Sequence, residues 1–417
     1  MGFLDALFGK EKKVEVPPFY DIVCPFCFQK FNPEDVVFRA SHSKEDDEEF
    51  CLQEDETLNK YRDRFDLAPL PDMEAVIDPD KIPFEYKRYV DGVLVEIVDK
   101  YGIPTRRRLC PKCHNELPLT AGKVPGNIIS IVGASQVGKS VYMTTLIHTL
   151  QNFTANNFDA ACLPISVDVS RRFRELYEDP IYGDGELLTS TRKTTKQEPL
   201  MFQFKFKNDQ KPPVTLVFFD IAGEGMVEKE YMDIFAAHIK NSSGILFLVD
   251  PLQMRTIRNK ISIKRQDDLG DFTARYDEPR EVIISMFENF IGNEEKGKTN
   301  IPTAVVITKS DMLKTLSGED YIKENSNIFN NVIHEKYFNI NEFENINGEV
   351  RRFVEKVDRA FVDAMEVYFS NTAYFAVSAL GSNPIEQKIQ STVSPVRVDE
   401  PFLWLLYQLK YIEGRRI

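Results

Sequence analysis

The stretch GASQVGKS, residues 133–140, places two glycines, a lysine and a hydroxyl at a spacing that can bind phosphate. In a loop of this form, successive backbone amides point inward and surround phosphate oxygens. Lys139 would reach the β- and γ-oxygens, and Ser140 would bind Mg²⁺. The pattern predicts a nucleotide-phosphate site made of Gly133, Ala134, Ser135, Gln136, Val137, Gly138, Lys139, Ser140 and Val141.

The residues on either side of this loop predict the elements that must position it. NIISIV, residues 127–132, has the apolar pattern of a buried strand, and residues 140–153 place Met143, Ile147 and Leu150 on one face of a helix. Strand, loop and helix therefore follow in the order that a phosphate-binding loop requires.

A second apolar strand ends in side chains that would complete the phosphate site. VTLVFFDIAGEG, residues 214–225, ends in Asp220-x-x-Gly223. The Asp220 carboxylate can hold Mg²⁺ through water, and Gly223 frees an amide for a γ-phosphate. We therefore expect residues 220–223 to face the loop at 133–140.

Two later strands end in residues that would read a base. AVVITKSDML, residues 304–313, places Asp311 where its carboxylate can accept two hydrogen bonds from the ring and amino nitrogens of guanine. The stem of Lys309 would stack on the base. AYFAVSALGSN, residues 373–383, would contact the guanine carbonyl oxygen through the backbone of Ser378, Ala379 and Leu380.

The order of these motifs, each after its own strand, resembles that of the Ras-like GTPases of the P-loop class, over roughly residues 126–390. The resemblance implies an α/β fold with a mostly parallel sheet. It also implies that GTP is bound and hydrolysed with Mg²⁺, and that the nucleotide changes the affinity for a protein partner. A first-switch threonine that binds Mg²⁺ is implied as well, and its candidates are Thr194 and Thr195.

Three residues depart from, or vary, the Ras-like pattern. Arg192 lies where the α subunits of heterotrimeric G proteins carry an arginine that neutralises transition-state charge, and the alternative is a solvated loop residue. Glu224 replaces the glutamine that orients the attacking water, which implies slow turnover without a partner. Thr308 replaces an asparagine of the base-reading motif, so a weaker tether to the phosphate loop is expected.

Four of the six cysteines form two Cys-x-x-Cys pairs, Cys24 with Cys27 and Cys110 with Cys113. Strand-like flanks favour a zinc ribbon over a redox dithiol, because a thioredoxin-like site needs a βαβ context. His114 could replace one sulfur ligand, although a surface histidine is the simpler interpretation. The pairs are far apart in the chain, so residues 40–90 are expected to form an insertion.

The predicted organisation has three parts: a flexible or amphipathic N-terminus at 1–15, a zinc ribbon at 16–122 and a Ras-like domain at 123–417. The acidic run at 44–50 is expected to be solvated or disordered. Residues 152–190 are too many for a switch loop alone and predict an addition. The segment 348–369 is predicted to be one helix.

Composition limits the classes of function. The net charge of −13 disfavours nucleic acid, and no apolar run is long enough to span a bilayer. A cytoplasmic location is expected, with membrane contact through the N-terminus as an option. Protein partners are expected; an ATPase, or a nucleic-acid adaptor using Arg106, Arg107 and Arg108, are the alternatives. The ribbon and GTPase arrangement is similar to that of bacterial double-GTPase-group proteins, thought to serve conflict or signalling systems.

Overall fold

The computed structural model describes residues 20–134, 137–188, 198–208, 211–218, 237–264, 279–286, 297–316, 322–384 and 388–416. The chain divides into two compact units. Unit 1 comprises Met1–Val23, Lys30–Leu58 and Leu70–Gly126. Unit 2 comprises Cys24–Gln29, Asn59–Pro69 and Asn127–Ile417.

Unit 2 is built on a sheet of seven strands, which confirms the predicted α/β fold. The strand order is β10-β11-β12-β9-β13-β14-β16. The pairs β10–β11 and β11–β12 are antiparallel, and all the others are parallel. The bounds are β9 (Asn127–Gly133), β10 (Ala160–Pro164), β11 (Leu200–Phe206), β12 (Val214–Phe218), β13 (Gly244–Val249), β14 (Thr303–Ile307) and β16 (Thr372–Ala376).

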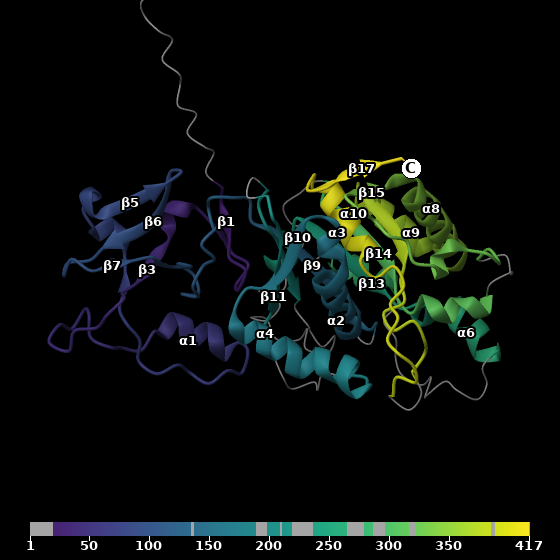
Figure 1. Ribbon diagram of the computed structural model, residues 1–417, viewed down its shortest axis with the longest axis horizontal. Coiled ribbons are helices and arrows are strands. Elements are labelled where there is room, and N and C mark those ends of the chain that lie inside the picture. Colours follow the sequence, from purple (N-terminus) through teal and green to yellow (C-terminus); the bar gives the residue numbers. More distant parts are fainter. Residues whose placement is uncertain are drawn as a thin grey trace, which may run out of the picture. The chain divides into compact units, whose positions relative to one another are not determined.

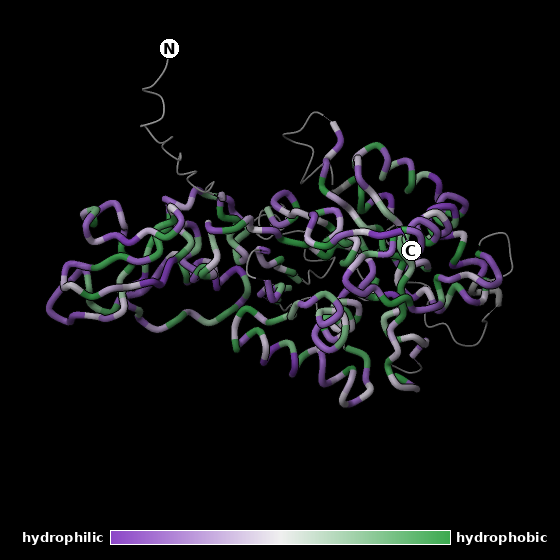
Figure 2. The backbone as a smooth tube through the Cα atoms, turned by 45° about the horizontal axis from the view of Figure 1, so that its top comes forward, coloured by the Kyte–Doolittle hydropathy of each residue, from purple (hydrophilic) through white to green (hydrophobic). Residues whose placement is uncertain are grey.

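The register of the parallel strands brings the predicted motifs to one edge of the sheet. Gly133 at the end of β9 pairs with Leu248, and Ile307 at the end of β14 pairs with Ala376. The carboxyl ends of parallel strands share one edge, where ligands bind in open α/β sheets. These strands are apolar because both faces of a parallel sheet are covered, and the hydropathy tube shows hydrophobic stretches inside the sheet region (Figure 2).

Helices cover the sheet, and one prediction about them is wrong. The helix after the phosphate loop is α2 (Lys139–Thr149), which continues as a π-helix, η4 (Leu150–Thr154). α8 (Ile340–Val357) packs on β16, and α10 (Glu400–Gln408) packs on β13 and β14 (Figure 1). The segment 348–369 does not form one helix, because Asp358 accepts a hydrogen bond from Phe361 N and starts α9 (Arg359–Tyr368).

Residues 152–190 contain an addition to the fold, as predicted. They contribute the edge strand β10 together with α3 (Ala155–Asn157), α4 (Val167–Phe173) and the π-helix η5 (Arg174–Asp184). The other elements of unit 2 are η6 (Pro251–Gln253), α6 (Arg255–Lys264), α7 (Pro279–Met286), η8 (Ser310–Leu316), η9 (Asn327–Phe329), β15 (Tyr337–Asn339) and β17 (Glu413–Arg415).

Unit 1 is β-rich and small. A three-stranded sheet has the order β4-β3-β8 and another has the order β5-β6-β7. The bounds are β3 (Val37–Arg39), β4 (Val76–Ile77), β5 (Lys87–Val90), β6 (Val93–Val98), β7 (Pro104–Thr105) and β8 (Arg107–Leu109). The remaining N-terminal elements are β1 (Ile22–Val23), β2 (Lys30–Phe31), η1 (Pro33–Asp35), α1 (Glu56–Asp63), η2 (Pro79–Lys81) and η3 (Phe84–Tyr86).

The acidic run at 44–50 is mostly exposed, as expected for a solvated segment, but it is ordered, which corrects the expectation of possible disorder. Lys100 Nζ lies 2.6 Å from the Asp47 carboxylate and 3.2 Å from that of Glu49. The same ammonium lies over the ring of Phe50. Tyr101 donates to the Asp47 carboxylate. A lysine that also lies over an aromatic ring therefore balances part of the local negative charge.

Within the described ranges, none of the helices combines the length and apolarity that a bilayer span requires.

Candidate nucleotide site and cysteine cluster

The described residues at the two ends of the loop after β9, Gly133 and Gly138, fit a phosphate-binding loop. Gly138 has φ +85°, in the left-handed region, and directly precedes α2. A Cβ at Gly133 would lie 2.8 Å from Leu248 O, so this position accepts only glycine. Lys139 Nζ donates to Gly133 O at 3.0 Å and to Ala134 O at 3.1 Å. The ammonium thus lies beside the loop, where the α2 N-terminus also favours an anion.

The loop after β14 is tied to the phosphate loop by Thr308. Its hydroxyl donates to Val137 O at 2.9 Å, and Val249 O also lies within reach at 3.2 Å. Thr308 is 4% exposed, so this hydrogen bond is protected from water. A threonine therefore keeps the tether that the sequence suggested would be weakened by the loss of asparagine.

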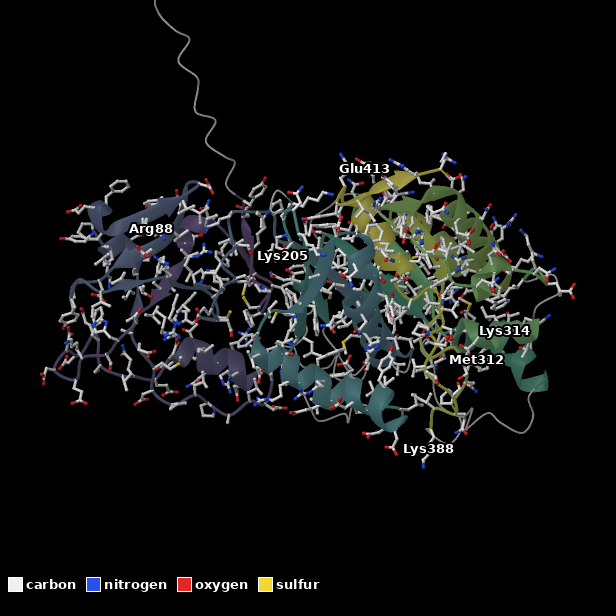
Figure 3. The ribbon with its side chains drawn as sticks, viewed as in Figure 1. Arg88, Lys205, Met312, Lys314, Lys388 and Glu413 are labelled. Atoms are coloured by element: carbon white, nitrogen blue, oxygen red, sulfur yellow. The ribbon has the colours of Figure 1, made fainter. Side chains whose placement is uncertain are left out.

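Asp311 and Ser378, from two different loops, are joined directly. Ser378 Oγ donates to Asp311 Oδ1 at 2.6 Å, and Gly381 N donates to Ser378 Oγ at 3.0 Å. Asp311 is the second residue of η8, and the residues after it include Met312 and Lys314, labelled in Figure 3. The predicted base-reading carboxylate of Asp311 and the predicted segment Ser378-Ala379-Leu380 therefore lie together. We call these residues, with Thr308, the corner.

The segment at 394–396, which no sequence motif indicated, supports this corner. Ser378 N donates to Val396 O at 3.1 Å, and Val396 N donates back to Ser378 O at 2.8 Å. Ser394 N donates to Leu380 O. A Cβ at Gly381, where φ is +82°, would lie 2.2 Å from Ser394 O. The segment carried no sequence signal, because it resembles an ordinary Ser/Pro/Val loop.

Asp250, which the sequence motifs did not indicate, contacts Lys309 in the loop that the sequence predicts to read the base. It follows β13, and its Oδ2 lies 2.5 Å from Lys309 Nζ. The Asp250 side chain is 3% exposed and that of Lys309 is 39% exposed. The available signal was the polar end of the apolar run GILFLVD at 244–250, in the position where the other strands carry site residues.

Several predicted site residues lie outside the described residues: Ser135, Gln136, Arg192, Thr194, Thr195, Asp220, Gly223 and Glu224. Ser140, Val141 and Ala379 are described and half-buried, next to the loops above.

The four predicted cysteine ligands come together. One ligand atom from each of Cys24, Cys27, Cys110 and Cys113 lies within 4.8 Å of the others, and all four residues are buried. The thiols form no disulfide. Tetrahedral zinc–thiolate bonds of about 2.3 Å place the sulfurs roughly 3.8 Å apart, which fits this cluster. The four thiols could therefore hold a zinc ion.

The two cysteine pairs have the same turn. Phe28 N donates to Cys24 O, and His114 N donates to Cys110 O. Phe28 has φ +58° and His114 has φ +52°, so both turns close with a left-handed residue. Asn115 Nδ2 lies 3.3 Å from Cys113 Sγ, a contact that stabilises a thiolate.

The His114 side chain bonds to Asp55 and so stabilises the turn that holds Cys110 and Cys113. Its Nδ1 lies 2.8 Å from Asp55 Oδ1, and Asp55 also pairs with Arg39 at 2.6 Å. Asp55 is nearly buried, and its hydrogen bonds with His114, Leu58 N and Arg39 outweigh desolvation and lower the pKa of its carboxyl. The alternative of His114 as a metal ligand is therefore not supported among the described residues.

The arginines that favoured a nucleic-acid adaptor are engaged within unit 1. Arg106 contacts Glu96, and Arg107 lies 3.3 Å from Glu116. Arg108 is buried and donates to the carbonyls of Pro118, Leu119 and Ala121. The triplet therefore stabilises the fold and does not form a free basic patch.

The fold and the corner formed by these loops define a P-loop protein of the GTPase class. The chain belongs to the Double-GTPase 2 family, whose model matches residues 127–391. It carries a GTP-binding, switch-like domain.

The chain is similar to a mycobacterial protein and to two solved GTPase structures. A curated protein of Mycolicibacterium smegmatis, described as "Putative ESX-1 scaffolding and assembly protein SaeC", is 23% identical and aligns over 92% of this chain and 97% of its own. The solved structure of the Arl6 (BBS3) small GTPase of Trypanosoma brucei is similar, with 14% sequence identity and a TM-score of 0.30. The match covers 69% of this chain and 99% of that chain. The GTPase-like domain of S. cerevisiae Ski7 has 12% identity, a TM-score of 0.31 and coverages of 69% and 51%.

Proposed function

We propose that the protein is a guanine-nucleotide-dependent switch that binds and hydrolyses GTP with Mg²⁺ and signals to a protein partner. The single observation that carries the proposal is the corner in which Thr308 bonds to Val137 O and Asp311 bonds to Ser378. These contacts support a base-reading role for Asp311 near the loop at 133–140. Membership of the Double-GTPase 2 family supports the same conclusion.

In the proposed site the phosphate and the base have separate partners. Lys139 and the α2 N-terminus bind the phosphates, and Ser140 and Asp220 hold Mg²⁺ with Thr194 or Thr195. Asp311 accepts from the guanine ring and amino nitrogens, and the Lys309 stem stacks on the base. Ser378 N is already bonded to Val396 O, so we assign the guanine carbonyl to the amides of Ala379 and Leu380.

Hydrolysis is proposed to be slow in the isolated protein. Gly223 would meet the γ-phosphate, and Glu224 would hold the attacking water less effectively than glutamine. Arg192 is the candidate for stabilising transition-state charge. Arg192→Ala should therefore lower the single-turnover rate of GTP hydrolysis. An unchanged rate would show that Arg192 does not stabilise the transition state.

The output is proposed to be protein assembly in the cytoplasm of a bacterium. The mycobacterial relative is described as a scaffolding and assembly protein, which supports a protein partner for this chain too. We also propose a zinc-ribbon domain at 16–122 with an insertion at 40–90, a GTPase domain at 123–417, and an N-terminus at 1–15 available for peripheral membrane contact.

The experiment that tests the proposal is to denature the purified protein and identify the nucleotides and metals that are released. We expect guanine nucleotide and one zinc ion per chain. Lys139→Ala is the matched control, because it removes the phosphate-binding ammonium and should reduce the nucleotide without changing the zinc. Adenine nucleotide in the wild type would overturn the guanine assignment.

A further inference from the structure

Asp250 lies at the base-reading corner and belongs to none of the motifs assigned above. Its two carboxylate oxygens have different partners: Oδ1 accepts from Leu252 N at 2.8 Å and Oδ2 contacts Lys309 Nζ at 2.5 Å. The first bond caps η6 and the second reaches the next loop along the sheet edge. The side chain is 3% exposed, so the ion pair is shielded from water on the Asp250 side.

Lys309 has a left-handed backbone conformation, which residues with a Cβ rarely adopt. Its φ is +52°, which is uncommon for a residue with a Cβ. The neighbours on both sides are pinned, because Thr308 N donates to Val249 O and Ser310 N donates to Val377 O. A strained conformation persists where the surrounding structure fixes it, and such positions cluster at ligand sites.

The lysine stem crosses the phosphate loop on its way to Asp250. A Cβ on Gly138 would lie 3.9 Å from Lys309 Cε, so the stem passes close to this glycine. A free lysine side chain samples many rotamers, and ordering it on binding would cost entropy. The contact with Asp250 fixes both ends of the stem before a base arrives, which reduces that cost.

We propose that Asp250 is the positioning residue that holds the Lys309 stem as a flat platform for the base of the bound nucleotide. The inference rests on the proposed guanine-nucleotide function and adds a residue to its base subsite. Asp250 acts through Lys309 and needs no contact with the nucleotide.

The variant Asp250→Asn tests this with little change in shape. Asparagine has one acceptor oxygen and one NH₂ group, whereas both carboxylate oxygens accept here. Either the η6 cap or the Lys309 contact must then face a donor. Charge-assisted hydrogen bonds are the stronger kind, so we expect GDP to bind roughly tenfold more weakly. The affinity for inorganic tripolyphosphate, which has no base, should not change.

Asp358→Asn is the matched control, because Asp358 also accepts a backbone N–H at a helix start, at 3.0 Å from Phe361 N. It should leave both affinities unchanged. Wild-type protein that binds tripolyphosphate as tightly as GDP would contradict the proposed function. Wild-type protein that prefers GDP, with the same preference in Asp250→Asn, would overturn only the role of Asp250.

A double variant keeps the test decisive if Asp250→Asn does not fold. Lys309→Met keeps an unbranched stem without the ammonium, and Lys309→Met/Asp250→Asn also removes the buried charge. If Asp250 acts only through Lys309, the double variant binds GDP as Lys309→Met does. A further loss of tenfold in the double variant would show that Asp250 acts independently and would overturn the inference.

Discussion

At the scale of single residues, Asp311 has the largest expected effect on ligand choice. Its Oδ1 already accepts from Ser378 Oγ, which fixes the orientation of the carboxylate plane. A site built to hydrogen-bond a ligand group rejects analogues that lack it, because its own polar atoms are left unpaired. The identity of one acceptor should therefore decide which purine is bound.

Asp311→Asn should exchange guanine for xanthine. Asparagine offers a donor where the carboxylate accepts, and xanthine carries a carbonyl where guanine carries an amino group. We expect GDP affinity to fall roughly 100-fold or more and xanthosine diphosphate to bind in its place. Fluorescence competition with both nucleotides measures this. Unchanged GDP affinity would show that Asp311 does not read the base.

A buried histidine makes the stability of unit 2 sensitive to acid. His238 Nε2 lies 2.7 Å from Ser130 Oγ, and burial lowers the pKa of the imidazole to about 3, from 6.5. Because the folded-state pKa is the lower one, the unfolded state binds the proton first as pH falls. The stability contributed by neutral His238 is complete above about pH 6.5 and is lost progressively towards pH 3.

The corresponding prediction is a reduced pH slope in His238→Asn. The wild type should lose up to about 1.4 kcal/mol of unfolding free energy per pH unit from this group. Urea unfolding at about pH 7.5 and about pH 5 gives the slope for both proteins. Equal slopes would mean that His238 is already protonated or accessible in the folded state.

The sequence predicted residues whose chemistry is visible in a short motif and missed those that act through the fold. Lys139 was predicted from its spacing to Gly133 and Gly138, and Asp311 from the Thr-Lys-Ser-Asp sequence at the end of an apolar strand. Asp250 was not, because its partner Lys309 is distant in the chain and only the order of β13 and β14 brings them together. The structured acidic run was also missed, since the Lys100 that balances it is far along the chain.

At the scale of elements, apolar runs predicted the strands well. The run NIISIV at 127–132 lies within β9, and the apolar start of AVVITKSDML at 304–307 lies within β14. Periodicity alone could not place the break between α8 and α9, because the apolar spacing continues across Asp358 while its side chain caps the second helix. The pairing of the segment at 394–396 with residues 378–380 depends on tertiary contacts and has no local signature.

Gly381→Ala tests that pairing. A Cβ there would lie 2.2 Å from Ser394 O, so the segment must move and should shift Ala379 and Leu380. We expect weaker GDP binding in addition to a cost of about 1 kcal/mol for the left-handed backbone. Gly102→Ala is the control for strain alone, since Gly102 has φ +78° with nothing within 4 Å of its Cβ. Calorimetry compares the two variants, and equal GDP affinity in both would contradict the expectation.

At the scale of the whole molecule, a GTPase-family domain and a four-cysteine cluster occur in one chain. The cluster is buried and its two turns match, which is the arrangement of a structural metal site. Binding of a structural metal contributes folding free energy, so its loss should destabilise the N-terminal part of the chain.

Cys110→Ser should reduce the zinc content, and Cys51→Ser should not. Cys51 is half-buried and its thiol donates to Glu48 O, outside the cluster. We expect one zinc ion per chain in the wild type and in Cys51→Ser, measured by elemental mass spectrometry. Cys110→Ser should hold less zinc and unfold at a lower temperature. A full zinc ion in Cys110→Ser would exclude this thiol as a ligand.

The central claim is that a phosphate-binding loop and a distant carboxylate together select a guanine nucleotide. The most direct measurement is calorimetric titration of the nucleotide-free protein with GDP and with ADP in the presence of Mg²⁺. The account predicts that GDP binds at one site per chain and at least 100-fold more tightly than ADP. Equal affinity for the two nucleotides, or tighter binding of ADP, would contradict it.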